Sequence, residues 1–190
     1  MIDVTLLEIA GLGAALSALR LPFGKEVRSD VDFRYGVKGV EHHGQNRISV
    51  HYRNDILINS KDIDLLSALV KRGDEHAKVL RGVVVWLSIN APRFWWVEAD
   101  TYSVGAIRMS SESTMHIQGK GLAEKELVEM KSELKEGTMQ RRVWCYSYQT
   151  LRRIYFQRRN HRLPHWRKFC EFIETLPFAK ELILCQPEKK

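Results

Sequence analysis

The 190-residue sequence contains no apolar run close to the roughly 18 residues that a membrane-spanning helix requires. Its start, Met1-Ile2-Asp3, lacks the basic residues of a secretory signal peptide. There are only three cysteines, without any CxxC spacing, which indicates neither a disulfide framework nor a zinc site. We therefore expect a cytoplasmic protein without membrane partners, in which Cys145, Cys170 and Cys185 are buried or incidental thiols.

Internal repeats and low-complexity linkers are also missing. The composition, 44% hydrophobic and 28% charged, is that of a compact folded chain, and it argues against disorder and against a coiled coil. We expect residues 1–190 to form a single domain.

Acidic residues are absent from the whole segment between Gly137 and Cys170. The same segment carries nine basic residues: Arg141, Arg142, Arg152, Arg153, Arg158, Arg159, Arg162, Arg167 and Lys168. Over the full chain, 30 basic and 23 acidic residues leave a net charge of +7, which favours partners that carry phosphate groups. The alternative is a solvated basic face that pairs with acids elsewhere in the chain, such as those of the stretch 124–136.

The first half of the chain has the patterns of strands with two helices. Short strands are predicted at 4–9, 48–52, 56–58 and 82–89, and the last of these is apolar enough to be a central strand covered on both faces. Helices are predicted from Gly11 to Leu21 and from an N-cap at Ser60 to Gly73. Residues 24–47 are glycine-rich and charged, which favours a loop or a hairpin.

The residues after Pro92 have mainly helical patterns. Pro92 ends the apolar strand and can begin a helix, and further helices are predicted at 122–134, 148–162 and 165–176. Strands and helices do not alternate regularly. The pattern therefore predicts an α+β fold, with a central, mostly antiparallel sheet in the N-terminal half, helices packed on it, and a helical C-terminal half.

The densest group of polar side chains lies between Asp100 and His116, directly after the aromatic triplet Phe94-Trp95-Trp96. These rings can cover a base or a flavin ring, or they can pack in the core. A Ser-His-acid triad of Ser111, His116 and Glu112 lacks any sequence resembling a nucleophile elbow.

A metal site is not expected either. His161 and His165 have the spacing of one helix face, but Pro164 lies between them and no HExxH motif is present.

The order of the segments resembles that of the flavin-dependent thymidylate synthases over most of the chain. Residues 4–21 are similar to that family's opening strand and alanine-rich helix, and 82–89 to its central strand. Ala91-Pro-Arg-Phe94 is similar to the lead-in of the family signature R-H-R-x-x-S-x-N-x-x-S-x-R. Thr150-Leu-Arg152 is similar to its Asn-Leu-Arg motif, whose arginine holds the nucleotide phosphate.

A gap-free count from Pro92 assigns residues of this chain to the positions of the signature. The triplet falls on Thr101, Tyr102 and Ser103, and the later positions fall on Ala106, Arg108, Ser111 and Ser113, of which only Ser111 is identical. The family holds the phosphates of FAD with its basic triplet. Here the basic run from Arg152 to Arg167 offers guanidinium groups, which suit phosphates.

The resemblance implies a pyrimidine-nucleotide-binding protein that uses FAD and transfers a one-carbon group to C5 of a deoxyuridine monophosphate-type substrate. It implies that Ser111 is catalytic and orients the pyrimidine. The resemblance further assigns nucleotide binding to Arg108, Ser113 and Arg152, and cofactor binding to Trp95, Tyr102, Arg158 and Arg159. Family active sites form between subunits, so a homo-oligomer, typically a tetramer, is implied as well.

A non-catalytic nucleotide- or nucleic-acid-binding protein on the same fold is the alternative. Aromatic residues alternate with the arginines of the acid-free segment, as binding of single strands requires: Trp144, Tyr146, Tyr148, Tyr155, Phe156 and Trp166. The same alternation results if one helix face is simply core, and the sequence leaves these interpretations open.

Overall fold

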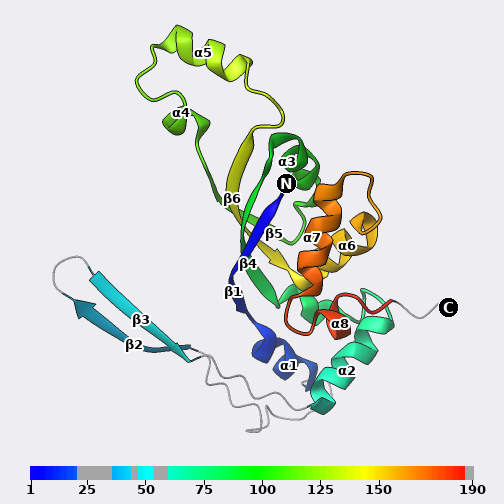
Figure 1. Ribbon diagram of the computed structural model, residues 1–190. Coiled ribbons are helices and arrows are strands. Elements are labelled where there is room, and N and C mark those ends of the chain that lie inside the picture. The colour runs from blue at the N-terminus through cyan, green and yellow to red at the C-terminus, as the bar shows by residue number, and fades with distance from the viewer. Residues whose placement is uncertain (21–35, 44–46, 54–59, 187–190) are drawn as a thin grey trace.

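The computed structural model describes residues 1–20, 36–43, 47–53 and 60–186 (Figure 1). Its main sheet has four antiparallel strands in the order β1-β4-β6-β5. These strands are β1 (Asp3–Ala10), β4 (Val84–Pro92), β5 (Ala106–Ser111) and β6 (Met139–Ser147). Helices pack on this sheet, so the predicted α+β class with an antiparallel sheet is confirmed.

Strand β4 occupies the centre of the sheet, as its apolar sequence predicts. Val85, Leu87 and Ile89 are completely buried, whereas the residues between them are only partly buried. The strand is therefore fully covered on one face and half covered on the other. Pro92 ends it, and helix α3 (Arg93–Ala99) begins at the next residue.

The covered face of the sheet packs against helices from the end of the chain. α6 (Tyr148–Arg158) and α7 (Pro164–Glu174) lie side by side there, followed by α8 (Ala179–Leu182) (Figure 1). Trp95 of α3, Trp144 of β6 and Trp166 of α7 are almost completely buried between these layers. A large aromatic core thus joins the sheet to the helices.

Helices α1 (Leu12–Arg20) and α2 (Ser60–Lys71) complete the body, and η2 (Lys78–Arg81) precedes β4. The turn between β1 and α1 depends on Gly11, which has a φ of 86°. A Cβ atom added there would lie 1.8 Å from the carbonyl oxygen of Gly82. Only glycine allows the two backbones to approach so closely.

The sheet differs from the expectation in its last two strands, because the patterns after Pro92 predicted mainly helices. The first half of β6 contains Gln140, Arg141 and Arg142, which do not have the composition of a buried strand. Only its second half, from Trp144 onward, is fully buried. The predicted helices of this region are confirmed as α5 (Glu124–Ser132), α6 and α7.

A separate two-stranded sheet pairs β2 (Gly36–His43) with β3 (Arg47–Arg53). Within 24–47, where a loop or a hairpin was expected, residues 36–43 form the first strand of a β2–β3 pair whose second strand is Arg47–Arg53. The strand predicted at 48–52 is confirmed as part of β3. Residues 24–35 and 56–58 lie outside the described residues.

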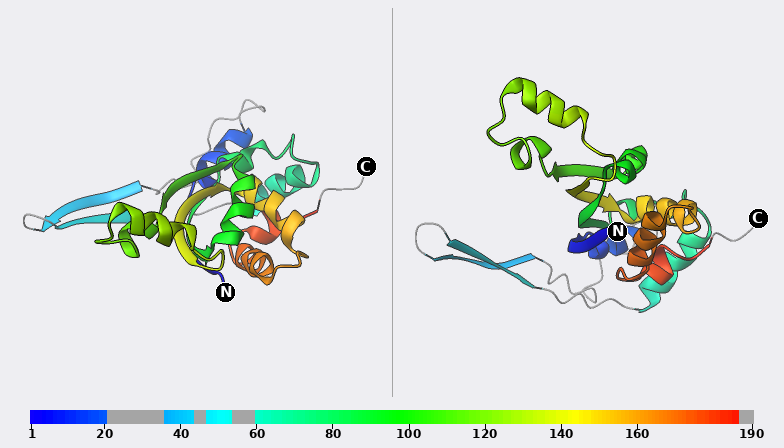
Figure 2. Two further views of the ribbon diagram at one scale, coloured as in Figure 1. Left: turned by 90° about the horizontal axis from the view of Figure 1, so that it is seen from above. Right: turned by 45° about the horizontal axis from the view of Figure 1, so that its top comes forward.

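Residues 112–138 form an arm that extends away from the sheet and carries α4 (Thr114–Ile117) and α5 (Figures 1 and 2). Its base is tied to β6 through Glu112, whose carboxylate accepts a 2.8 Å hydrogen bond from the backbone N–H of Arg141. The acidic stretch 124–136 lies on this arm, away from α6 and α7 (Figure 2).

All three cysteines are free, with Cys145 and Cys170 buried. Among the described helices, none combines the length and the apolar character needed to cross a membrane.

Candidate functional site

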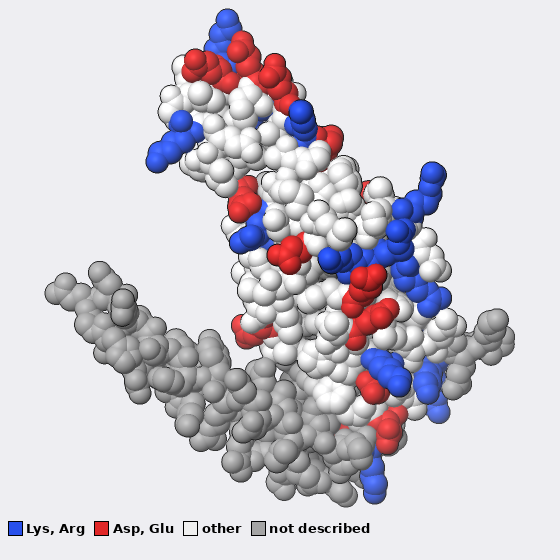
Figure 3. All heavy atoms as spheres, in the orientation of Figure 1, with Lys and Arg blue, Asp and Glu red and all other residues white. Residues whose placement is uncertain are grey.

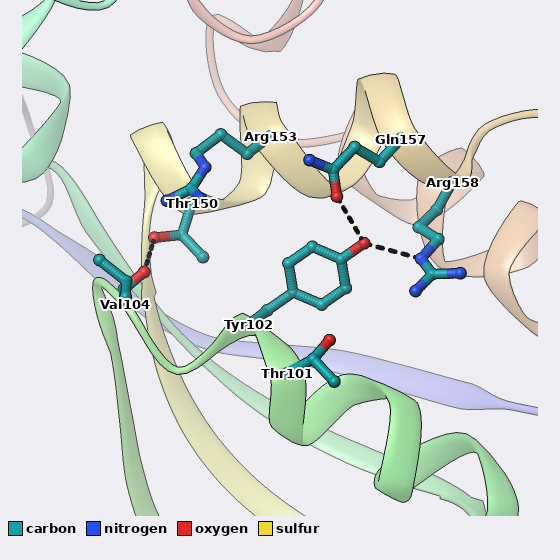
Figure 4. A pocket seen from close by; sticks show the side chains of 7 residues that line it. All are labelled: Thr101, Tyr102, Val104, Thr150, Arg153, Gln157 and Arg158. Atoms are coloured by element: carbon teal, nitrogen blue, oxygen red, sulfur yellow. Dashed lines mark hydrogen bonds between the residues drawn. The ribbon is translucent and has the colours of Figure 1, made fainter.

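The short 3-10 turn η3 (Asp100–Tyr102) follows α3 and has polar groups on both sides. On the side of α6 lies a pocket of about 220 Å³ (Figure 4). Ligand pockets usually measure about 300 to 1,000 Å³, so this one suits part of a small ligand. Its lining residues are Thr101, Tyr102, Val104, Thr150, Arg153, Gln157 and Arg158.

Helix α6 supplies the polar wall of this pocket. Thr150, Arg153 and Gln157 follow one another at three- and four-residue spacing, which aligns side chains on one face of a helix. Arg158 donates a 2.7 Å hydrogen bond from Nε to the phenolic oxygen of Tyr102. The hydroxyl of Tyr102 in turn donates to Oε1 of Gln157 at 2.8 Å (Figure 4).

Glu98 of α3 lies behind the pocket and balances part of its charge. Its Oε2 accepts a 2.7 Å hydrogen bond from Nε1 of the buried Trp166 and lies 3.4 Å from Nη1 of Arg158. His161 Nε2 is 3.9 Å from the same oxygen. Arg153 has no carboxylate partner within the described part of the chain, so the pocket keeps an uncompensated positive charge.

Asp100 is the centre of a second group, which we call the Asp100 cluster: Asp100, Arg108, Arg142, Trp96 and Trp144. Asp100 pairs with Arg108 at 3.2 Å and with Arg142 at 3.5 Å. The guanidinium of Arg142 lies 4.5 Å from the ring centre of Trp96, and that of Arg108 lies 5.2 Å from the ring centre of Trp144. Two arginines share one carboxylate, so this side of η3 is also positive.

Burial lowers the pKa of Arg142, and the adjacent Asp100 carboxylate acts in the opposite direction. The arginine stays charged at neutral pH because an ordinary guanidinium titrates far above that range. Taken together, the two sides of η3 hold four arginines, namely Arg108, Arg142, Arg153 and Arg158, against the two carboxylates Glu98 and Asp100. An anion with two negative charges would balance this excess.

The structure brings several of the predicted site residues close to η3. Tyr102 and Arg158 line the same pocket. The register of β5 and β6 pairs Ser111 with Arg142 and Arg108 with Trp144, which places Ser111 and Arg108 on one face of the sheet. Ser111 is exposed there.

Two other predicted residues lie at a greater distance from the pocket. The hydroxyl of Ser113 accepts a 3.3 Å hydrogen bond from the backbone N–H of His116 and so caps α4 at the base of the arm. The guanidinium of Arg159 lies 5.2 Å from the ring centre of Phe156 and does not line the pocket.

Trp95 and Arg152 require a correction. Trp95 has no exposed surface and packs edge-on against Phe169, so its ring presents no face on which a ligand can stack. Arg152 is 3% exposed, and its Nη1 donates to the carbonyl oxygens of Ile183 and Cys185. Both side chains hold the fold together, and we do not include them in the site.

The residues that sequence reasoning did not assign to the site include Arg142, Arg153 and Gln157. The helical spacing of Thr150, Arg153 and Gln157 was the signal that could have revealed the polar face of α6. No comparable signal marked Arg142, because its position depends on the pairing of β6 with β5.

The basic face of α6 and α7 does not pair with the acidic arm. Figure 3 shows Lys and Arg side chains gathered over these helices. Within the described ranges, the carboxylates that pair with this segment are Glu98 and Asp100, neither of which belongs to 124–136. The alternative that the cations of this segment pair with the acidic stretch 124–136 is therefore wrong.

Most aromatic residues of the same segment belong to the core. Five of them are buried and two are half-buried; the buried ones are Trp144, Tyr146, Tyr148, Trp166 and Phe169. The segment therefore lacks the exposed rings on which single-stranded nucleic acid would stack. This observation removes the main support for nucleic-acid binding.

The residues present do not fit FAD in the manner that the resemblance implied. Thr101, Tyr102 and Ser103 stand at the positions of the basic triplet and carry no cation, and the hydroxyl of Tyr102 is engaged by Gln157 and Arg158. A pocket of about 220 Å³ within one chain is also smaller than a dinucleotide with two ring systems requires.

No protein-family model and no curated protein matches the sequence. Solved structures do match it. A flavin dependent thymidylate synthase ThyX from Helicobacter pylori, complexed with FAD and dUMP, has a TM-score of 0.65 and 13% sequence identity, over 97% of this chain and 99% of that chain. A second structure of Helicobacter pylori ThyX with FAD and dUMP has a TM-score of 0.64 and 13% identity, over 96% and 97% of the two chains.

A UMP/dUMP methylase PolB from Streptomyces cacaoi, bound with 5-Br dUMP, is similar as well. Its TM-score is 0.60 at 11% identity, over 95% of this chain and 91% of that chain. These similarities confirm the predicted resemblance at the level of the fold.

Proposed function

We propose that this chain is a pyrimidine-nucleotide-binding protein on the fold of the flavin-dependent thymidylate synthases, with a ligand of the dUMP type. The observation that carries the proposal is the excess of two positive charges around η3, beside the polar pocket. The solved structures of the same fold support it, because they contain dUMP or its 5-bromo derivative.

The two sides of η3 suit different parts of a nucleotide. Arg153 and Arg158 offer guanidinium groups to the phosphate, and Tyr102, the last residue of η3, lines the same pocket. Arg108 and the exposed Ser111 lie on the sheet side, where Ser111 would orient the pyrimidine. Ser113 and Arg159 stay predictions at the edge of this site.

One-carbon transfer to C5 of the base is the catalytic form of the proposal, and it requires a cofactor. Because the triplet positions carry no charge, we derive no step through FAD. The residues described above bind and orient the nucleotide.

Isothermal titration with dUMP tests nucleotide binding. Absorbance titration with FAD, in the presence and absence of dUMP, tests the catalytic form of the proposal. We expect saturable binding of dUMP. A flavin spectrum that shifts on adding dUMP would support the catalytic form. Absence of dUMP binding would contradict the proposal as a whole.

Association into a homo-oligomer, such as a tetramer, is part of the proposal. Ile107 and Met109 on the edge strand β5 are 61% and 57% exposed, which is unusual for large apolar side chains on a strand. Light scattering coupled to size-exclusion chromatography measures the number of copies in the oligomer.

Two further expectations stay predictions: that residues 1–190 form a single domain, and that the protein is located in the cytoplasm.

A further inference from the structure

Arg152 of α6 is a buried cation whose two terminal nitrogens are used unequally. Its side chain is only 3% exposed, and no carboxylate of the described residues pairs with it. Nη1 faces three acceptors: the carbonyl oxygens of Ile183 and Cys185 and, at 3.5 Å, Sγ of Cys185. Nη2 is buried too, but it has no hydrogen-bond partner in the part of the chain that the structure describes. The guanidinium therefore lacks both an acceptor and a counter-charge, and burial makes each of these costly.

Cys185 lies beside this guanidinium, shortly after the end of α8. It is half-buried, whereas Cys145 and Cys170 are buried. Its thiol donates a 3.0 Å hydrogen bond to the carbonyl oxygen of Glu181, which leaves the lone pairs of the sulfur for Nη1 of Arg152. Of the three thiols, this one combines access to solvent with a neighbouring cation. These two features characterise cysteines that react with oxidants.

We propose that Cys185 is an oxidation site for hydroperoxides and that the guanidinium of Arg152 holds the anionic product. The sulfur attacks one oxygen of the peroxide. The S–O bond forms, the O–O bond breaks, and the leaving hydroxide takes up the thiol proton and becomes water. Sulfur is oxidised to a sulfenic acid while the peroxide is reduced. A second peroxide molecule reacts in the same way to give a sulfinic acid, which loses its proton to water.

The oxidised side chain fits these surroundings better than the thiol does. The new oxygen is bonded directly to Sγ, which is already 3.5 Å from Nη1, so it lies within reach of the guanidinium. It offers the unused Nη2 an acceptor and supplies the buried cation with a negative charge. The contact with Glu181 loses only a weak S–H donor. Oxidation should therefore stabilise the fold, whereas oxidation of a thiol in an apolar core would destabilise it.

The inference is independent of the proposed function, because neither Arg152 nor Cys185 lines the pocket. Arg152 connects α6 to the residues after α8 through the carbonyl oxygens that it binds. An anion at Cys185 would strengthen this connection, so the stability of the folded chain is the property that oxidation changes.

Mass spectrometry after treatment with hydrogen peroxide tests the reaction. The full chain is oxidised in the presence of dimedone, which traps sulfenic acids, and its peptides are mapped. We expect Cys185 to be labelled at least about tenfold faster than the buried Cys145 and Cys170, which are controls within the same molecule. Without dimedone, Cys185 should gain the oxygens of a sulfinate. Met109, which is 57% exposed, reports that the peroxide has acted.

Urea denaturation then tests the role of the guanidinium. The midpoint of the wild type should rise after oxidation, whereas oxidised Cys185→Ser, the control for oxidised methionines, should show no rise. Cys185→Asp places a permanent carboxylate at this position, and Cys185→Asn is its neutral match. We expect the folding equilibrium constant of the aspartate variant to be about tenfold larger, the scale of one charge-assisted hydrogen bond.

Two controls separate Arg152 from a general effect of charge. Gln186 is the next residue and is exposed. Gln186→Asp should exceed Gln186→Asn by less than about twofold, because a solvated charge contributes little. In the background of Arg152→Ala, Cys185→Asp should lose its advantage over Cys185→Asn. If that background does not fold, the comparison with position 186 still decides.

Equal labelling of the three cysteines, or an unmodified Cys185 in protein whose Met109 is oxidised, would overturn the assignment of the oxidation site. A midpoint that falls on oxidation, an equal gain from aspartate at 185 and 186, or a gain that persists without Arg152 would overturn the role of the guanidinium. None of these outcomes bears on nucleotide binding, which the titration with dUMP tests separately.

Discussion

Nε of Arg158 donates a 2.7 Å hydrogen bond to the phenolic oxygen of Tyr102, and this contact joins α6 to the turn η3. The guanidinium of the same arginine pairs with Glu98, at 3.4 Å, and lies 4.9 Å from the ring centre of Trp166. The wall of the pocket is thereby connected to the aromatic core. Such support keeps a binding group in one orientation before the ligand arrives.

Replacement of Arg153 by alanine should weaken dUMP binding about tenfold, the scale of one charge-assisted hydrogen bond at a partly solvated site. The fold should be unaffected, because the side chain of Arg153 is exposed. Calorimetry measures the Kd and urea denaturation measures the stability. Arg162→Ala is the matched control, and an equal loss of affinity in both variants would show that only the overall charge matters.

Replacement of Arg152 by alanine should instead lower the free energy of unfolding by about 2 to 4 kcal/mol, because it leaves one buried and one partly buried carbonyl oxygen without their donor. The urea midpoint measures this loss. At a temperature where the variant is folded, its Kd for dUMP should equal that of the wild type. A variant that keeps its stability but binds dUMP more weakly would show that Arg152 belongs to the binding site.

Replacement of Gly11 by alanine should destabilise the fold by more than about 2 kcal/mol, since the new Cβ would collide with the carbonyl oxygen of Gly82 at a strained φ. Gly121 has nearly the same φ, 83°, but nothing lies within 4 Å of its added Cβ. Gly121→Ala should therefore cost only about 1 kcal/mol. Thermal unfolding of both variants measures the difference, and equal costs would contradict the close approach of the two backbones.

Alkaline pH should destabilise the protein through Cys170. Burial raises the pKa of its thiol from 9.0 to about 12, so the folded state keeps a proton that the unfolded chain releases. This contribution to the free energy of unfolding is complete below pH 9 and is lost as the pH rises from about 9 to about 12. Burial also raises the pKa of Tyr148, which adds to the loss in the same direction.

Urea midpoints at pH 7, 9 and 10.5 measure this effect. Cys170→Ala should show a shallower fall between pH 9 and 10.5 than the wild type, with a remaining slope from Tyr148, Tyr146 and Cys145, whose pKa values burial also raises. Parallel profiles for the two proteins would exclude Cys170 as a source of the pH dependence.

Local patterns predicted those elements whose burial is visible along the chain. The apolar run at 82–89 is β4, and the amphipathic stretch 165–176 corresponds to α7. β6 escaped prediction because Gln140, Arg141 and Arg142 look like surface residues. The burial of its second half comes from pairing with β4 and from packing against α7, which are contacts between distant parts of the chain.

The candidate site was predictable only in part. Tyr102 and Arg158 were named from the resemblance, and the structure places them in one pocket. Arg142 joins Arg108 around Asp100 only because β5 pairs with β6 across a bulge. Pairing of two strands that are separated by the whole arm, 112–138, leaves no local signal.

The sequence by itself determined that a long segment carries nine cations and no acid, and so that this region of the protein is basic. Only the tertiary structure decided what each cation does. Arg152 and Arg153 are neighbours, but successive residues of a helix point about 100° apart. The packed side of α6 buries Arg152 against the end of the chain, whereas its open side turns Arg153 toward the pocket.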